Sequence, residues 1–253
     1  MSCALMFGLN YTGTSSQLYG CHNDVRNVGT FLKGIGFEVK VFTDDVNPKE
    51  TTGMGMIRNL YELGLRSHTQ DLKFVWIHYS GHGSWVRDTN REELDGRDEC
   101  LVPSDFQTNG FIVDDMINPL LKNFNPKTRV ILVFDCCHSG TMCDLKYSWP
   151  MDFKKPIVEN KNSLIPSNVL SLSGCLDAQT AADAFNVLGD NKPIGALTGC
   201  LLLLLQKDAK KYLNDIICLV RDLQSLLKTS NYSQVPKLCS TYNVLADKVV
   251  FPL

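Results

Sequence analysis

Two short segments, Leu72 to Tyr79 and Arg129 to Phe134, are almost continuously apolar. Each has the length of a β-strand, and a strand without alternating polar residues is expected to be buried on both faces. Apolar residues at helical spacing lie between such runs, first at Asn23 to Lys33 and again from Pro48 to Leu65. Strands that alternate with helices predict an α/β fold with a mostly parallel central sheet flanked by helices.

The same pattern continues on either side of these segments. We predict further strands at Cys3 to Leu9, Phe37 to Phe42, Asn168 to Leu172 and Lys248 to Phe251, and further helices at Ala196 to Leu205 and from Ile216 to Leu227. The polar segment from Tyr147 to Pro166 contains three prolines, so it is predicted to be an exposed linker. The chain then forms a single domain, 1–253, made of a larger region 1–146, a linker 147–167 and a smaller region 168–253.

Composition excludes several classes of function. The 253 residues carry a net charge of −2, with an isoelectric point near 6.2, which favours neither nucleic acid nor an anionic membrane as a partner. The ten cysteines form no Cys-x-x-Cys pair, so a structural zinc site is not expected. The start of the chain does not resemble a signal peptide, and the Leu201 to Leu205 run is too short to span a bilayer. We expect a cytoplasmic protein with mostly free thiols.

Chemically reactive residues follow the two central strands. The first strand runs into Ser80-Gly81-His82-Gly83, and the second runs into Asp135-Cys136-Cys137-His138-Ser139-Gly140. Ligands of parallel α/β sheets bind beyond the carboxyl ends of the strands. If the two strands are neighbours, the imidazole of His82 lies beside the thiol of Cys137. A thiol next to an imidazole that can take its proton is the arrangement of a nucleophilic cysteine.

Each of these signals alone has a simpler interpretation. A histidine between glycines is often a turn residue, and adjacent cysteines after a strand are more often buried packing residues. A redox or metal function for Cys136 and Cys137 is disfavoured because vicinal cysteines form strained disulfides and chelate zinc poorly. The joint placement is more specific: 55 residues separate His82 from Cys137, against about 50 for the same pair in caspases.

Seven stretches in order along the chain resemble the short-linker metacaspases. They are ALMFGLNY (4–11), LYGCHNDV (18–25), HYSGHGS (78–84), DECLVPSDF (98–106), GFIVDD (110–115), FDCCHSG (134–140) and LSGCLDAQTAADA (172–184). The resemblance implies a caspase-haemoglobinase α/β fold and a cysteine endopeptidase. It assigns His82 as the catalytic base and Cys137 as the nucleophile, and it places Cys136 at a position that is not the nucleophile. The backbone N–H groups of Gly83 and Cys137 would form the oxyanion hole.

The resemblance also implies a substrate class. It places Cys21, Asp24, Ser80 and Asp135 in the specificity pocket, whose two carboxylates would favour Arg or Lys before the scissile bond. Taken without the resemblance, Asp24 is a residue of a helix's first turn and Asp135 a turn residue. Lys154, Lys155 and Lys161 in the predicted linker are candidate sites of self-cleavage.

A second acidic group matches the calcium site of the family. Its members are Asp98, Asp114, Asp115 and Asp144, and oxygen ligands from several loops suit Ca²⁺ better than zinc. Taken alone, Asp114 and Asp115 are a solvated turn. The resemblance further implies a monomer. Two departures from the family pattern are a start close to the first core strand, from which we expect no prodomain, and Leu176 where a polar residue is usual.

Two rival hypotheses come from different functional classes. A non-enzymatic scaffold of the same fold would have lost His82 or Cys137, and both are present. A legumain-like or paracaspase-like protease would share the acidic specificity pocket but not the second acidic group. A peptide-cleavage assay with and without calcium discriminates among these hypotheses.

Overall fold

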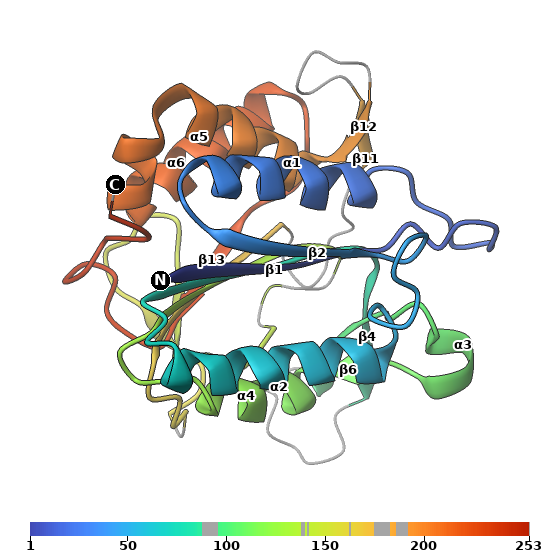
Figure 1. Cartoon of the computed structure of the whole chain (residues 1–253). Coiled ribbons are helices and arrows are strands. Elements are labelled where there is room, and N and C mark those ends of the chain that lie inside the picture. The colour runs from blue at the N-terminus through green and yellow to red at the C-terminus, as the bar shows by residue number, and fades with distance from the viewer. Residues whose placement is uncertain are drawn as a thin grey trace.

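A central sheet runs through the whole molecule (Figure 1). The computed structural model describes residues 1–87, 96–137, 140, 142–161, 163–174, 183–185 and 192–252. Eight strands form the sheet, in the order β2-β1-β3-β7-β10-β13-β8-β9. Their bounds are β1 Ser2–Gly8, β2 Glu38–Thr43, β3 Phe74–Ser80, β7 Arg129–Asp135, β8 Tyr147–Trp149, β9 Ile157–Val158, β10 Asn168–Ser173 and β13 Lys237–Ser240. The first five in the row are mutually parallel, which confirms the predicted α/β fold with its mostly parallel sheet.

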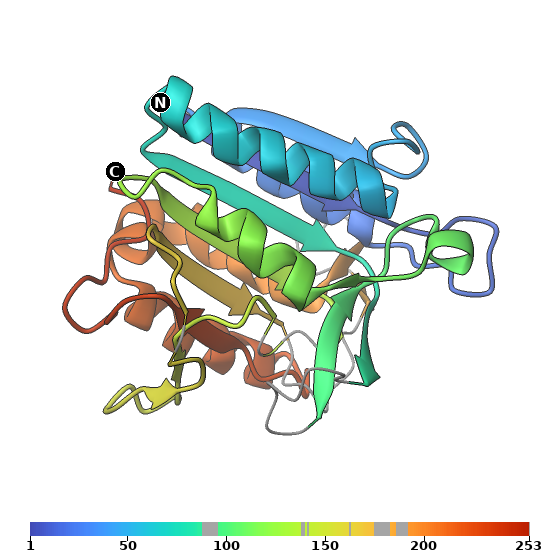
Figure 2. The same ribbon diagram turned by 90° about the horizontal axis from the view of Figure 1, so that it is seen from below.

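Helices cover both faces of this sheet (Figures 1 and 2). On one face lie α1 (Cys21–Gly34), α5 (Ala196–Asn214) and α6 (Ile216–Thr229), and on the other lie α2 (Gly53–Thr69) and α4 (Asp114–Lys122). Helix α2 begins at Gly53 rather than at Pro48, because the Thr52 hydroxyl accepts a hydrogen bond from the Gly55 N–H and caps the helix there. Helix α5 continues past Leu205 and has a non-helical residue at Asp208. No helix in the described ranges has the length and apolar character to cross a membrane.

Alternation along the strands sorts the side chains between two cores. In β3, Trp76 faces the core beneath α1, α5 and α6, while Ile77 and Tyr79 face the core beneath α2 and α4. Because successive strand residues point to opposite faces, Ser80 lies on the side of Trp76. In β7, Val133 faces α5, and Cys136 just beyond the strand belongs to the core under α2 and α4. The strand pattern therefore decides which of the terminal residues of β3 and β7 share a face.

Smaller strand groups stand at the carboxyl edge of the main sheet. One sheet contains β4 (Gly83–Arg87), β5 (Arg97–Leu101) and β6 (Ile112–Val113), and the short helix α3 (Phe106–Asn109) lies between β5 and β6. A second pair is β11 (Asp183–Phe185) with β12 (Pro193–Gly195). None of these strands was predicted from the sequence, since each has at most five residues.

The predicted linker proves to be partly built into the sheet. Tyr147–Trp149 forms β8 and pairs with β13, and Trp149 is buried with its indole Nε1–H donating to the Ser240 hydroxyl at 2.8 Å. The interpretation of 147–167 as an exposed linker is thus wrong for its first three residues. The Pro-rich part after them has exposed lysines, as predicted, although Phe153 and Ile165 anchor it in the core.

The predicted last strand, Lys248 to Phe251, is also wrong. Those residues are not part of any strand, and β13 is the final strand instead. The segment is held to the body through Arg129, whose guanidinium donates to the Val249 carbonyl and the Asp247 carboxylate. Aromatic packing of Phe251 on Phe37 and Phe74, with ring centroids 4.8 Å apart in both pairs, covers the strand beginnings. The apolar pattern that suggested a strand therefore reflects packing of an irregular tail.

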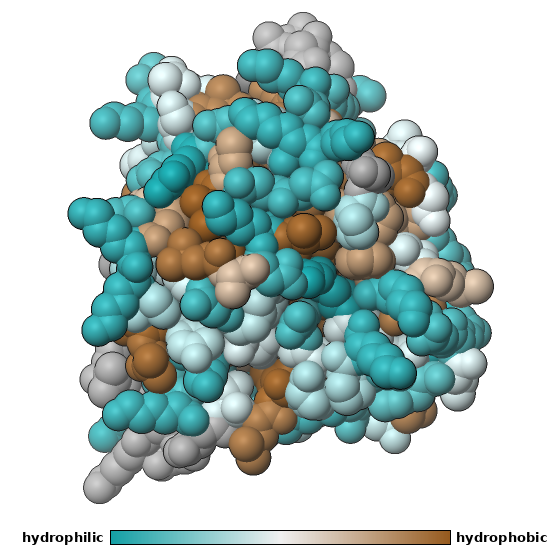
Figure 3. Space-filling model, turned by 90° about the vertical axis from the view of Figure 1, so that its left-hand side faces the viewer, coloured by the Kyte–Doolittle hydropathy of each residue, from teal (hydrophilic) through white to brown (hydrophobic). Residues whose placement is uncertain are grey.

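The amino ends of the parallel strands lie at the molecular end that faces the viewer in Figure 3. Hydrophilic residues cover much of that face, and hydrophobic ones form several separate patches among them. The chemically reactive residues picked out from the sequence lie at the opposite, carboxyl edge, where the strands meet α3, β4 and β12 (Figure 1).

Candidate active site

The two predicted catalytic residues follow neighbouring strands. β3 and β7 are parallel partners, and Ser80 pairs with Asp135 at their ends. The pairing extends one step further, because the Gly81 N–H donates to the Asp135 carbonyl at 3.4 Å. His82 and Cys137 each come two residues after this matched pair of strand ends. Both lie at the carboxyl edge of the sheet, in loops that follow adjacent strands, as nucleophilic catalysis by a cysteine requires.

Gly83 brings the two loops into backbone contact. A Cβ atom at Gly83 would lie 1.8 Å from the Cys137 carbonyl oxygen and 3.2 Å from the Cys136 Sγ. A side chain at this position would therefore push the histidine and cysteine loops apart. This contact gives a physical reason for the glycine after His82.

The adjacent cysteines differ in exposure. Cys136 is fully buried in the core under α2 and α4, whereas Cys137 is partly exposed. A nucleophile must be reached by its substrate, so the geometry supports Cys137 over Cys136. None of the nine described cysteines is part of a disulfide.

The imidazole of His82 is oriented by a backbone carbonyl. Its Nε2 lies 2.7 Å from the Ser16 carbonyl oxygen. A carbonyl oxygen can only accept, so Nε2 carries the proton and Nδ1 of the neutral ring is left as the basic nitrogen. The ring also packs on Tyr11, with centroids 4.9 Å apart. Ser16 escaped the sequence analysis because a carbonyl oxygen has no sequence signature.

The predicted specificity pocket is assembled from α1, β3 and β7. Asp24 lies in the first turn of α1 and is 1% exposed, and its carboxylate accepts a hydrogen bond from the Ser80 hydroxyl. Asp135, at the end of β7, is 4% exposed and faces the same side of the sheet. Cys21 is buried at the start of α1, one helical turn before Asp24. The structure thus brings all four predicted pocket residues to one place.

The amino end of α5 contacts both carboxylates of this group. The Gly195 N–H donates to Asp24 Oδ1 at 2.7 Å, and the Thr198 N–H donates to Asp135 Oδ2 at 2.9 Å. Amides at a helix N-terminus favour the charged form of a carboxylate. The hydroxyl oxygen of Thr198 is 3.3 Å from Nε2 of His78. His78 is fully buried, and burial lowers the pKa of its imidazole to about 3. No sequence pattern indicated that Gly195 and Thr198 would contact these carboxylates, because they lie in a different part of the chain.

Gly195 also fixes the separation of the two carboxylates. A Cβ atom there would lie 2.1 Å from Asp135 Oδ2 and 2.9 Å from Asp24 Oδ2. The two oxygens therefore lie within about 5 Å of each other, the sum of the two distances. Two like charges at that separation repel by roughly 3 kcal/mol at an effective dielectric constant of about 20. A cationic side chain placed between them would relieve this repulsion.

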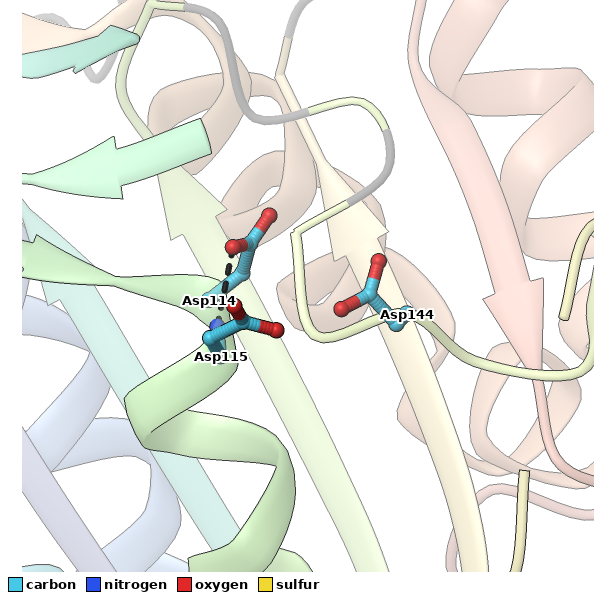
Figure 4. Close-up of side chains that lie close together, drawn as sticks. All are labelled: Asp114, Asp115 and Asp144. Atoms are coloured by element: carbon cyan, nitrogen blue, oxygen red, sulfur yellow. Dashed lines mark hydrogen bonds between the residues drawn. The ribbon is translucent and has the colours of Figure 1, made fainter. Parts of the chain in front are cut away.

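The second acidic group gathers between α4 and the loop after Cys137 (Figure 4). Ligand oxygens of Asp114, Asp115 and Asp144 all lie within 4.8 Å of one another. Asp114 is buried, and its carboxylate accepts hydrogen bonds from the Asp115 N–H at 2.9 Å and the Glu99 N–H at 3.1 Å. The fourth predicted ligand, Asp98, is buried on β5 and directly precedes Glu99. Carboxylate oxygens without thiol or imidazole fit a hard cation such as calcium.

The backbone that carries Asp144 is strained. Cys143 and Asp144 have φ angles of 84° and 47°, a region that side-chain-bearing residues rarely adopt. The turn is tied to α4, because the Asn118 amide donates to the Cys143 carbonyl at 2.9 Å. This conformation directs the Asp144 carboxylate toward Asp114 and Asp115 (Figure 4). The strained turn lies on the connection that leaves Cys137, so the acidic group and the nucleophile share one short segment.

Comparisons with known proteins agree with this geometry. The family described as "Metacaspase, peptidase C14 domain" matches residues 3–146. Metacaspase-2 of Trypanosoma brucei brucei is 33% identical over 97% of this chain and 74% of its own length. Metacaspase-1A of Neurospora crassa is 30% identical over 96% of this chain and 63% of its own length. A crystal structure of a Geobacter sulfurreducens protein superposes with a TM-score of 0.69 and 22% identity, covering 99% of this chain and 98% of that one, which shows a shared fold.

Proposed function

We propose that this chain, which belongs to the metacaspase family of caspase-like cysteine peptidases, cleaves peptide bonds after Arg or Lys and depends on calcium. The observation that carries the proposed specificity is the pair of buried carboxylates, Asp24 and Asp135, beside the loops of His82 and Cys137. The cluster of Asp114, Asp115 and Asp144 supports the proposed calcium dependence, and Asp98 on β5 is proposed as a fourth ligand.

The proposed reaction uses the two loops at the ends of β3 and β7. Nδ1 of His82 takes the proton of the Cys137 thiol, and the thiolate attacks the scissile carbonyl carbon. The N–H groups of Gly83 and Cys137 donate to the oxygen as it becomes negative. The imidazolium then protonates the leaving amine, and a water molecule hydrolyses the resulting thioester, which returns the thiol. The Ser16 carbonyl holds Nε2–H throughout and stabilises the imidazolium.

The proposed specificity follows from charge and hydrogen bonding in the pocket. Asp24 and Asp135 each accept an amide hydrogen bond from the start of α5, and Asp24 also accepts one from the Ser80 hydroxyl. An ionised carboxylate has about four lone-pair sites. A guanidinium group can donate to both carboxylates in a planar fork, and an ammonium group can approach them as a point charge. An Asp side chain in the same place would add a third negative charge, so substrates cleaved after Asp are excluded.

We expect Asp24→Asn to raise KM for an Arg peptide by about 10- to 100-fold, the effect of losing one charged hydrogen bond. Asn keeps one acceptor oxygen for Ser80 or Gly195, so the pocket walls are retained. Peptides with Arg, Lys or Asp before the scissile bond are compared by steady-state kinetics. Asp222→Asn, which removes a carboxylate that is 41% exposed on α6, is the control. Efficient cleavage of the Asp peptide, or an unchanged KM in Asp24→Asn, would refute the proposed specificity.

The calcium proposal rests on the structural elements that carry the four aspartates. Asp98 is on β5, Asp114 and Asp115 begin α4, and Asp144 lies on the connection after Cys137. β5 pairs with β4, whose first residue is Gly83. When bound, calcium would supply positive charge that cancels the mutual repulsion of the carboxylates. The four aspartates would then hold β5 and the connection after Cys137 at a fixed separation, and with them the two catalytic loops.

Self-cleavage is expected in the exposed segment between β8 and β10. Lys154 is 83% exposed at its side chain, and Lys155 and Lys161 are also exposed. We expect active enzyme with calcium to yield two fragments by denaturing mass spectrometry, and Lys→Gln changes at all three positions to prevent this. The fragments should stay together in native size-exclusion chromatography, because β10 pairs with β7 and β13 pairs with β8 across the cut. An intact chain that still cleaves peptides would show that processing is not required.

A further inference from the structure

We propose that the buried hydroxyls of Tyr11 and Tyr79 are positioning groups that fix the backbone of His82 and thereby aim its Nδ1 at Cys137. The inference rests on the proposed function only in taking His82 as the base. Both tyrosines are almost fully buried, 3% and 1% exposed, and their hydroxyl oxygens are 3.1 Å apart. They reach the site from different elements: Tyr79 is on β3, and Tyr11 is in the loop between β1 and α1.

The two hydroxyls contact both polar groups of the His82 main chain. The His82 N–H donates to the Tyr11 oxygen at 3.0 Å, and the Tyr79 hydroxyl donates to the His82 carbonyl at 2.7 Å. The Tyr11 hydroxyl donates to the Val102 carbonyl at 2.6 Å. The Val102 N–H completes the set, lying 3.2 Å from the His82 carbonyl and 3.3 Å from the Tyr79 oxygen. The Tyr79 hydroxyl is also 3.1 Å from the Val102 carbonyl oxygen, so every donor in the group has at least one acceptor.

The location of His82 explains why such a group is needed. His82 lies between the end of β3 at Ser80 and the start of β4 at Gly83. Its carbonyl accepts from the Val102 N–H just beyond β5, whereas its N–H donates to a tyrosine hydroxyl instead of to a strand. A buried backbone N–H or C=O without a partner is costly, so the phenol groups act in place of a neighbouring strand. Burial raises the pKa of both phenols above the ordinary tyrosine value. They therefore stay protonated and can donate throughout the pH range of peptide hydrolysis.

The same loop also controls the imidazole ring. Tyr11 has a φ of 50°, and the N–H groups of Asn10 and Tyr11 both donate to the Asp44 carboxylate, at 3.0 and 2.7 Å. Five residues later, Ser16 accepts the His82 Nε2–H. The Tyr11 ring packs against the imidazole as well. His82 is thus held at its N–H, its C=O and its Nε2–H, and its Nδ1 is the one polar group that these contacts leave for the thiol.

The test removes each hydroxyl while keeping the ring. We expect Tyr11→Phe and Tyr79→Phe each to lower kcat by about 10- to 100-fold, the effect of an error of up to about 1 Å in a reacting group. KM for an Arg peptide should stay within about twofold, because the specificity pocket faces the other side of β3. Tyr212→Phe is the matched control: Tyr212 is also buried and donates to Asp222 at 2.9 Å, but it lies on α5 away from His82. Its kcat should be unchanged.

A second readout does not depend on cleavage. The rate at which iodoacetamide alkylates Cys137 is measured from pH 5 to 10 by peptide mass spectrometry. A thiolate paired with the His82 imidazolium reacts well below the ordinary cysteine pKa of about 8.5. In both Phe variants the alkylation profile of Cys137 should move toward that higher pH. The partly exposed Cys218 on α6 is an internal control whose profile should not move.

The outcomes separate this inference from simple destabilisation and from the proposed function. Urea unfolding gives the folded fraction of each variant under assay conditions. A fall in kcat that matches the loss of folded protein, with an unmoved Cys137 profile, would overturn the positioning role, and so would an unchanged kcat in both variants. If the parent protein cleaves no Arg or Lys peptide, the proposed specificity fails, while the alkylation profiles still decide whether the two hydroxyls position His82.

Discussion

Cys137→Ala is expected to reduce peptidase activity by about 10⁴-fold or more, because loss of a covalent nucleophile leaves only binding and oxyanion stabilisation. Loss of the small, partly exposed thiol should not alter the fold. Circular dichroism and urea unfolding check the fold, and hydrolysis of an Arg peptide checks the activity. His82→Ala should cost at least the roughly 10²- to 10⁴-fold that general base catalysis contributes.

Cys136→Ala provides the matched control for the nucleophile. The side chain of Cys136 is buried against the core under α2 and α4, so its removal should lower the free energy of unfolding and leave kcat almost unchanged. The two adjacent cysteines then give opposite results, one in activity and one in stability. Loss of activity in Cys136→Ala with a retained rate in Cys137→Ala would mean that the nucleophile has been assigned to the wrong thiol.

The second large effect is expected from the acidic group at the start of α4. Asp114→Asn and Asp144→Asn should each abolish the calcium response and lower activity by about 10²-fold, because a displacement near 1 Å in the Cys137 loop is enough for such a loss. Asn keeps the shape of the side chain, and at Asp114 it keeps an oxygen for the Glu99 N–H. Peptide hydrolysis is titrated with calcium from an EGTA-buffered baseline, and calcium binding is measured separately by calorimetry.

Asp71→Asn is the control for this experiment. Asp71 is an exposed acid paired with Lys73 in the turn before β3, so the calcium titration of that variant should match the parent protein. Magnesium should not replace calcium, since magnesium demands near-octahedral geometry, whereas calcium accepts less regular sets of oxygen ligands. Full activity of the parent protein in excess EGTA would show that the acidic group is a solvated patch without a regulatory role.

Much of the central fold could be predicted from local patterns. The buried parallel strands β1, β3, β7 and β10 gave apolar runs because both of their faces are covered, and α1 and α6 gave helical spacing because one face packs on the sheet. The turns after β3 and β7 could be identified as the reactive edge, since parallel strands end on the same side. The resemblance to metacaspases added the roles of the pocket and of the acidic group.

Other elements were beyond the reach of local patterns. β4, β5, β6 and β8 are short, and they form strands because a neighbouring strand supplies hydrogen bonds. The tail from Lys248 shows the opposite case, where an apolar sequence packs without forming a strand. A segment of a few residues is too short to display a hydrophobic period, so propensity cannot decide whether it forms a strand or a loop.

The sequence by itself determined the identity of the reactive groups and the edge of the sheet at which they gather. Only the tertiary structure decided their partners: Gly195 and Thr198 reach Asp24 and Asp135 across more than 60 residues, and the Tyr11 hydroxyl reaches the His82 N–H across 71. Such contacts close long loops whose ends carry no matching signal, and several of them use a backbone amide or carbonyl that every residue possesses. The sequence therefore determines which reactive side chains are present, whereas the orientation of those side chains depends on the folded structure.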